Sequence, residues 1–484
     1  MNENCNYLQS ILGVFVHSAN VPQHVIEVLA HAGLSISIKS IQRAVKSMSA
    51  DSAHRIKESL RSLKVGIAYD NFDINFKTSE PTLTHQSSFV SATSATAIPL
   101  VGVDDIEVLR CSEQLWNVDP RNPSPLASPV EFDEFDLLKY HLMDSYNHPI
   151  PGKYISPQRE TFAWHIREIL VNHGQHFGHL SKHLGTPTTV LQIPLTKTDQ
   201  IPMRSMKIKQ SSVDGNIKVM ENLLRQGGLG DTTDLGFSAN GDIDLSDFVL
   251  FVHGDLLTKE RLDTIRDSQR IEDTPKNRFQ FVVFLLGLFH YKMACVDALW
   301  RTYLRDKDGR SDLNSTYQHV GILRPRETGI MTSKPGFRRM HDVVHHELRA
   351  TILECWRTEA SAQDPDNIAS LKDFAVLKPD WDLVVKISDD IVQKYVATTE
   401  GLSTSRANPE TDRDQQFKNQ TVRNRDYLLY VDLCNAMNAG DIGRVEASFL
   451  PWIYIFCATG KHKYASQLAR FLKNLHEVYP PALR

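Results

Sequence analysis

The chain has 484 residues, which is enough for a large core and for roughly two to four structural units at the usual size of about 150 residues each. A composition of 41% hydrophobic and 23% charged residues is ordinary for a globular protein, and no uninterrupted apolar stretch approaches the roughly 20 residues that cross a bilayer. The net charge of −4 excludes wholesale coating of nucleic acid. Local basic clusters stay possible nucleic-acid footprints, namely Lys39/Arg43/Lys46, Arg338/Arg339, Arg423/Arg425 and Lys461/Lys463.

The cysteines indicate a reducing compartment. The first six residues have neither the basic start nor the apolar core of a secretory signal. The six cysteines are scattered singly, without a Cys-x-x-Cys zinc motif, at Cys5, Cys111, Cys295, Cys355, Cys434 and Cys457. We therefore expect an intracellular protein with reduced thiols and no membrane span.

The first predicted elements are two helices within residues 22–64. Apolar residues recur there at helical spacing, and the turn Ala32–Ser35 separates the two runs and offers a serine to cap the second helix. The second helix carries Lys39, Gln42, Arg43 and Lys46. This pattern favours a small helical hairpin with no such role, and a DNA-reading helix-turn-helix is the alternative.

The run Val65–Phe72 follows and predicts a buried strand that delivers Asp70. Residues 79–130 are rich in Ser, Thr and Pro, which predicts loops around one short strand near Ile98–Val103. A helical stretch is expected at about 131–184.

Alternating strands and helices come next. We predict strands at 190–195, 248–254 and 279–288, and helices at 216–225, 258–270 and 291–304, with Thr258 as the N-cap of the second of these helices. Residues 305–425 read as mostly helical with polar connectors, and helices close the chain over 427–477. This order is that of a mixed α/β protein.

Two of the predicted strands end in an aspartate, at Asp70 and at Asp255. Ligand sites gather where buried strands end, and hard divalent cations prefer carboxylate oxygens held on a rigid backbone. The pair therefore predicts a shared Mg²⁺ or Mn²⁺ site. Without that site, Asp70 starts a turn and Asp255 simply ends a strand.

The order of these elements is similar to the ribonuclease H-like fold, in which a mixed sheet is flanked by helices. Enzymes of that fold cut or join phosphodiesters with two metal ions held by acidic residues, the last of them on a late helix. The resemblance implies an N-terminal helical region at 1–64, a core at 65–304 with a loop and helical insert at 79–185, a helical insertion at 305–426, and C-terminal helices at 427–484 that complete the core. A long helical insertion at this place resembles hobo/Activator-type DNA transposases.

Four segments also resemble the fungal domain-of-unknown-function family numbered 6589, whose members look like relics of transposable elements. They are Tyr69–Phe72, His253–Thr258, Leu288–Cys295 and Gly440–Glu446. A Gln commonly follows the Gly-Asp pair in that family, where this chain has Leu256. Members also usually continue past Tyr479–Arg484, so the resemblance implies a truncated copy.

The third acid that the resemblance implies is Glu446, on a predicted late helix whose apolar positions mark a buried face. Asp297 is the reserve, because it follows the last strand and shares a helix with large apolar residues. His290 is a further candidate, either as a ligand or to orient a phosphate. A solvated glutamate and a core histidine are the ordinary fates of such residues.

Histidines supply a competing metal site. His341 and His345 stand one helical turn apart and resemble the His-Glu-x-x-His zinc signature, with Asp342 in place of the usual Glu and only Glu347 or Glu354 as a conceivable third ligand. His176, His179 and His183 also fall at three- and four-residue steps, which is typical of a surface helix and otherwise of a metal-binding or pH-responsive face.

Three function classes follow from these residues. The first is a transposase-derived metal-dependent nuclease or strand-transferase that acts on DNA, or its inactive descendant, in the nucleus and as a possible homo-oligomer. The second is a non-catalytic nucleic-acid-binding or scaffold protein. The third is a zinc hydrolase that uses His341 and His345.

Overall fold

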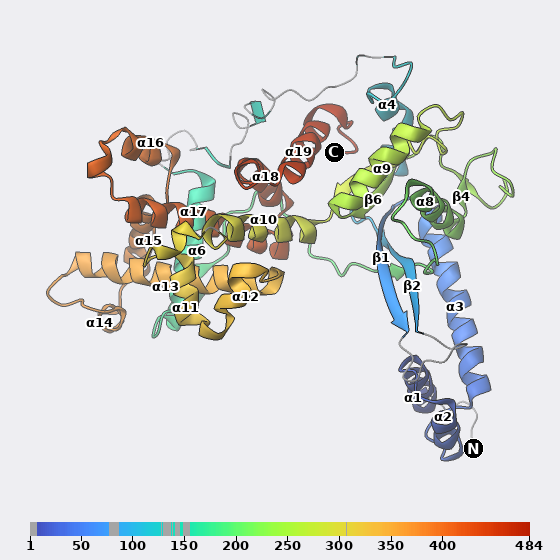
Figure 1. Cartoon of the computed structure of the whole chain (residues 1–484), viewed down its shortest axis with the longest axis horizontal. Coiled ribbons are helices and arrows are strands. Elements are labelled where there is room, and N and C mark those ends of the chain that lie inside the picture. Colours follow the sequence, from blue (N-terminus) through green and yellow to red (C-terminus); the bar gives the residue numbers. More distant parts are fainter. Residues whose placement is uncertain are drawn as a thin grey trace. The chain divides into compact units, whose positions relative to one another are not determined.

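The computed structural model describes residues 7–76, 87–126, 128, 137, 139–140, 146–148, 155–305 and 307–484 (Figure 1). The predicted helix at 131–184 falls partly outside these residues. The chain divides into two compact units. Unit 1 comprises residues 1–130, 197–286 and 478–484, and unit 2 comprises residues 131–196 and 287–477.

Unit 1 is built on a mixed five-stranded sheet with the order β3-β2-β1-β6-β7. β1 is antiparallel to β2 and parallel to β6, and β6 is parallel to β7. The strands are β1 (Val65–Phe76), β2 (Ser88–Pro99), β3 (Ile201–Pro202), β6 (Leu250–Gly254) and β7 (Val282–Leu286), and a separate pair is formed by β4 (Leu229–Gly230) and β5 (Ile243–Asp244). The predicted mixed α/β architecture is thus confirmed.

Unit 1 also contains six α-helices in its described residues, and the first two precede the helix that leads into β1. They are α1 (Tyr7–Ser18), α2 (Gln23–His31), α3 (Ile38–Arg61), α4 (Ser112–Asn117), α8 (Val213–Gly227) and α9 (Leu256–Gln269). Figure 1 shows α3 (blue) running from α1 and α2 along β1 and β2. The core of the sheet joins Ile67 of β1 and Val252 of β6 to Leu60 of α3, Leu223 of α8 and Leu262 of α9. A second cluster holds Leu109, Cys111, Val249 and Val283, with Tyr479 and Leu483 packed against it.

Unit 2 is helical in its described residues. Its α-helices are α6 (Pro157–His173), α7 (Ser181–Leu184), α10 (Leu288–Tyr303), α11 (Thr316–Leu323), α12 (Thr328–Ser333), α13 (Phe337–Gln363), α14 (Leu371–Val376), α15 (Trp381–Tyr395), α16 (Thr399–Ala407), α17 (Gln415–Ala439), α18 (Ile442–Ala458) and α19 (His462–Lys473). A π-helical turn over Asn474–Val478 follows α19. The buried centre of this unit lies among α6, α10, α13, α17 and α18, which pack on one another.

Several predicted strands differ from the structure. β2 begins at Ser88 and ends at Pro99, although its Ser/Thr-rich sequence predicted loops with a strand only near 98–103. Pairing with β1 over twelve residues satisfies the backbone hydrogen-bonding groups of β2. This pairing outweighs the weak local preference of the segment for a strand. Residues 190–195 form no strand, apart from one bridge between Gln192 and Asp441.

Two helix starts and one strand end were also predicted wrongly. Ser37, rather than the serine of the turn at 32–35, caps α3 by accepting from the Ser40 N–H. Asp255, rather than Thr258, caps α9. Asp70 does not close its strand, because β1 continues to Phe76. By contrast, α8 ends at the predicted glycines, where Gly228 adopts the left-handed conformation with φ of 66°.

Candidate functional site

The two predicted carboxylates of unit 1 lie on adjacent parallel segments. Gly66 of β1 pairs with Phe251 of β6, and Ala68 pairs with His253, a constant sequence offset of 185 (251 − 66 and 253 − 68). Asp70 and Asp255 are separated by the same offset (255 − 70). Each aspartate therefore lies two residues beyond the last pair of this register, Asp70 within β1 and Asp255 just after the end of β6.

Each carboxylate makes one local hydrogen bond. Asp70 is exposed, and its Oδ1 accepts from the Asn71 N–H at 2.7 Å. Asp255 is half-buried, and its Oδ1 accepts from the Thr258 N–H at 2.7 Å as the cap of α9. A carboxylate accepts through two oxygens, so both side chains can still bind a cation through Oδ2.

His253 is a neighbour that the sequence reasoning missed. It pairs with Ala68, two residues before Asp70, and residues two apart in a strand share a face. Its imidazole lies against Gly66, where an added Cβ would come within 2.8 Å of Nε2. Burial lowers the pKa of His253. A neutral imidazole thus shares the sheet face of Asp70, and its position directly before Gly254-Asp255 was the available signal.

Tyr69 lies on the face of β1 opposite to Asp70. Its hydroxyl donates to Asn216 Oδ1 of α8 at 2.9 Å. Burial raises the pKa of Tyr69, and the nearby charge of Asp255 raises it further, while Arg261 of α9 lowers it. The phenol therefore stays protonated and serves to hold β1 to α8.

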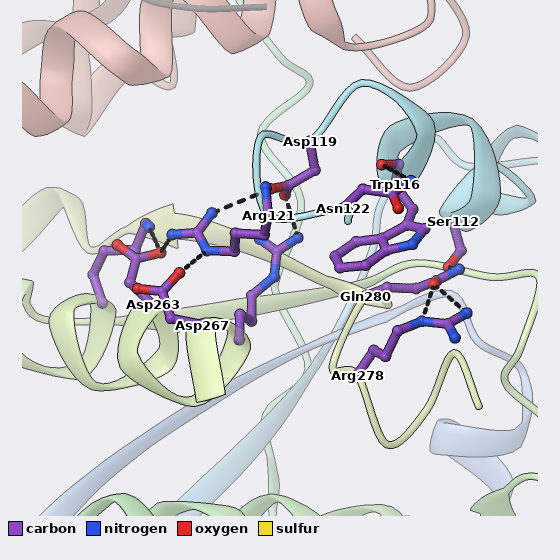
Figure 2. A network of polar contacts seen from close by, with 11 residues as sticks. Ser112, Trp116, Asp119, Arg121, Asn122, Asp263, Asp267, Arg278 and Gln280 are labelled. Carbon is purple, nitrogen blue, oxygen red and sulfur yellow. Dashed lines mark hydrogen bonds and ion pairs between the residues drawn. The ribbon is translucent and has the colours of Figure 1, made fainter. Parts of the chain in front are cut away.

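An ion-pair network holds α9, the helix that Asp255 caps. Arg121 lies between Asp119 on one side and Asp263 and Asp267 of α9 on the other, as Figure 2 shows. Its Nη2 donates to Asp263 at 3.0 Å, its Nε to Asp267 at 2.6 Å and its backbone N–H to Asp119 at 2.9 Å. The surrounding charges raise the pKa of Arg121 against the opposing effect of its burial. The loop after α4 is thereby tied to two successive turns of α9.

The helix before this loop, α4, is fixed by aromatic and amide contacts. The guanidinium of Arg278 lies 5.5 Å from the ring centre of Trp116, and the buried Gln280 donates to Ser112 Oγ at 2.9 Å (Figure 2). These contacts join α4 to the segment that leads into β7. The ion pairs of Arg121 thus hold the middle and the C-terminal part of α9, while Asp255 caps its N-terminus.

Glu446 belongs to unit 2, on the first turns of α18. It is half-buried, and its Oε1 lies 3.0 Å from Nε2 of His476. The start of α18 is fixed by the fully buried Arg444, which pairs with Asp441 at 2.9 Å and with Asp432 at 2.7 Å. Glu446 therefore stands on a firmly held helix end.

The reserve residues lie on α10 of the same unit. Asp297 Oδ2 pairs with Arg301 Nε at 3.0 Å and with Lys461 Nζ at 2.7 Å. His290 is half-buried beside the ring of Phe289. Two cations thus already neutralise Asp297.

His341 and His345 of α13 meet a third ligand that the sequence reasoning missed. In the described part of the chain, one group of three metal-ligating side chains has ligand atoms within 4.8 Å of one another, and it comprises His341, His345 and Cys434 of α17. Burial raises the pKa of the Cys434 thiol to about 11, against the opposing effect of Lys292. Burial also lowers the pKa of His345 to about 3. A cysteine far along the chain gives no local spacing signal, so only the packing of α13 on α17 reveals it.

The acids expected near these histidines have other partners. Asp342 pairs with Arg324 at 3.2 Å. Glu347 is buried and bonded to Thr316, His319 and Tyr427, and Glu354 pairs with Arg357. Neither glutamate belongs to the group of three.

Two other sequence features also differ from expectation. His176, His179 and His183 are exposed but share no continuous helix, because α6 ends at His173 and His176 has a φ of 80°. In the basic cluster Arg423/Arg425, Arg423 is buried against Glu347 at 3.2 Å, so it is not available to a nucleic acid.

The matched residues 154–484 identify the chain as a member of the family of unknown function (DUF6589). No curated protein and no solved structure matches the chain. Within the described residues, no helix is both long and apolar enough to cross a membrane.

Proposed function

We propose that this protein derives from a transposase and that its sheet is a ribonuclease H-like core with a metal-dependent phosphodiester-cleaving site. The observation that supports the proposal is the parallel register of β1 and β6, because Asp70 and Asp255 each follow its last pair by two residues. Two carboxylates beside adjacent parallel strands could supply oxygens to one cation from rigid backbone.

The strand order supports the ribonuclease H-like assignment. A hairpin opens the sheet, and a third antiparallel strand follows β2 at one edge. After α8, the strands β6 and β7 add in parallel on the other side of β1, with α9 between them. The first acid thus lies on the opening strand, and the second follows the strand that comes after the first core helix.

In the proposed chemistry, Asp70, Asp255 and a third acid would hold Mg²⁺ or Mn²⁺. Such ions would supply activation of the attacking hydroxyl and stabilisation of the leaving oxygen. The third acid is proposed from the sequence resemblance, which puts it on a late helix.

We assign the third acid to Glu446 in preference to Asp297. Asp297 is paired with two permanent cations, Arg301 and Lys461, which would compete with a metal ion. Glu446 contacts the imidazole of His476 rather than an ammonium or guanidinium group. His290 keeps its proposed role of orienting a phosphate.

DNA is the proposed partner, and α1–α3 are the proposed reader. These helices have their own core of Val16, Ile26 and Ile41. The amino-terminal part of α3 exposes basic and amide side chains that suit phosphate and base contacts, namely Lys39, Gln42, Arg43 and Lys46. A transposase origin also leads us to propose a nuclear location and assembly as a homo-oligomer.

Nicking of supercoiled DNA in Mg²⁺ or Mn²⁺ tests the proposal. We expect metal-dependent nicking by the wild type and at least a hundredfold loss in Asp255→Asn, because the substitution removes the charge that holds the cation. Asparagine is as good an N-cap as aspartate, so α9 should stay intact. Asp70→Asn should behave alike. Asp73→Asn is the matched control, because Asp73 is also exposed on β1 but points to the opposite face.

The remaining outcomes separate the alternatives. Loss of nicking in Glu446→Gln supports the assigned third acid, whereas unchanged nicking there and loss in Asp297→Asn would move the role to Asp297. Equal nicking by wild type and Asp255→Asn would indicate a contaminant and refute the site. DNA binding that weakens in Arg43→Ala, without any metal-dependent nicking, would identify a non-catalytic DNA-binding descendant.

A further inference from the structure

We infer that unit 2 contains a zinc site, formed by His341 and His345 of α13 together with Cys434 of α17. The site is independent of the proposed nuclease, because it uses none of the carboxylates assigned there. It also differs from the zinc-hydrolase pattern in the sequence, since its third ligand is a thiolate from another helix.

The donor set and its size suit Zn²⁺. One thiolate and two imidazoles are ligands that zinc accepts in tetrahedral sites, with Zn–N near 2.0–2.1 Å and Zn–S near 2.3 Å. Those bond lengths put neighbouring ligand atoms roughly 3.3–3.6 Å apart in a tetrahedron. The three ligand atoms all lie within 4.8 Å of one another without a metal, so no pair needs to close by more than about 1.5 Å.

The hydrogen bonds of the two histidines leave nitrogens available for the metal. His341 Nδ1 lies 2.8 Å from the hydroxyl of Tyr430, so its other ring nitrogen, Nε2, is the one left for zinc. Zinc-bound histidines commonly direct their second ring nitrogen at such an oxygen, which fixes the orientation of the ring. Tyr430 and Cys434 are one turn apart on α17, so one helix supplies both the thiolate and the group that orients His341.

His345 gives the second, independent observation. Its Nε2 is buried and has no hydrogen-bond partner. A buried polar atom without a partner is costly, and most such atoms in native proteins are satisfied by water, a side chain or an ion. The two imidazole rings are 4.4 Å apart between centres, so a cation bound by one reaches the other. Zinc would satisfy the orphan nitrogen and would tie α13 to α17.

The order of the donors explains why no motif reveals the site. The histidines stand four apart on one helix, and the thiolate arrives from a helix that packs against it. Three protein ligands leave a fourth position for a water molecule, as in zinc centres that are not fully closed by protein.

Metal analysis of the 484-residue chain, purified without a histidine tag, tests the inference. We expect one zinc per chain in the wild type and a loss of at least fivefold in Cys434→Ser and in His345→Ala. His346→Ala and Cys457→Ser are the matched controls, because His346 is the exposed neighbour on α13 and Cys457 is an exposed thiol of unit 2, and both should keep their zinc. His345→Cys should also keep zinc, since it replaces one zinc ligand by another.

Cobalt gives a readout that does not depend on stability. Replacing zinc by Co²⁺ in the wild type should produce a thiolate-to-cobalt charge-transfer band, and Cys434→Ser should lack it while retaining the wild-type helical circular dichroism. The inference would be overturned if the wild type contained no zinc and also showed no cobalt band. It would also be overturned if Cys434→Ser retained zinc, or if the wild type contained copper in place of zinc. None of these results depends on DNA nicking.

Discussion

Arg444 offers the sharpest test of how unit 2 holds α18, the helix that carries Glu446. Its side chain is 0% exposed and donates to three side chains, to Asp441 Oδ2 at 2.9 Å, Asp432 Oδ1 at 2.7 Å and Asn435 Oδ1 at 2.8 Å. Arg444→Met keeps an apolar stem of similar length but removes the charge. Two buried carboxylates then lose their common cation.

The loss of unfolding free energy in Arg444→Met depends on the hydrogen-bond partners that each carboxylate retains. Asp441 still accepts from the N–H groups of Val190, Leu191 and residue 444. Asp432 keeps its polar contacts with the Tyr146 hydroxyl and the His165 imidazole, neither of which is a permanent cation. Removing one partner of a buried ion pair typically costs about 3–5 kcal/mol, and we expect Arg444→Met to fall in that range.

Urea unfolding followed by tryptophan fluorescence measures this loss. Five of the six tryptophans belong to unit 2, because only Trp116 lies in unit 1, so the signal reports mainly on the unit that contains Arg444. With a urea dependence of about 3 kcal/mol per molar, a loss of about 3–5 kcal/mol lowers the midpoint by about 1 M or more.

Two companion variants make the result specific. Arg357→Met removes an exposed arginine paired with Glu354 and should leave the midpoint unchanged, because exposed pairs contribute little. Asp432→Asn introduced into Arg444→Met should recover part of the loss by removing the unpaired charge. An unchanged midpoint in Arg444→Met, or a shift as large in Arg357→Met, would refute the assigned role of the buried pairs.

Two further predictions concern pH and the sheet. Desolvation raises the pKa of Asp441, but the backbone N–H groups of Leu191, Arg444 and Val190 and the Arg444 guanidinium outweigh it, so the net pKa is lowered. Its contribution is therefore present above the unfolded-state pKa of about 3.9 and is lost as pH falls through the lower folded-state pKa. Urea midpoints between about pH 6 and pH 3 should fall less steeply in Asp441→Asn than in the wild type, and parallel curves would contradict this account. Gly66→Ala should destabilise unit 1 by about 1–3 kcal/mol, because the new Cβ would lie 2.8 Å from His253 Nε2. Amide hydrogen exchange of β1 and β6 should detect this loss, and His253→Ser should relieve it; an additive double variant would exclude the clash.

Local signals in the sequence determined much of this molecule. The apolar runs that end near Asp70 and Asp255 predicted β1 and β6, since a strand buried on both faces needs apolar side chains at successive positions. The glycines at 227 and 228 predicted the end of α8, because a left-handed helix end favours glycine. The family membership of residues 154–484 was likewise recognisable from short segments.

Tertiary structure decided what depends on partners remote in the chain. The Ser/Thr-rich segment at 88–99 became a strand because β1 offered a full ladder of hydrogen bonds, which no local propensity encodes. Cys434 lies beside His341 and His345 because α17 packs on α13. Arg444 can be buried because it forms ion pairs with Asp432 and Asp441. Sequence patterns report the neighbours of a residue along one element, whereas a ligand set or a buried ion pair needs the distances between elements, and packing alone fixes those distances.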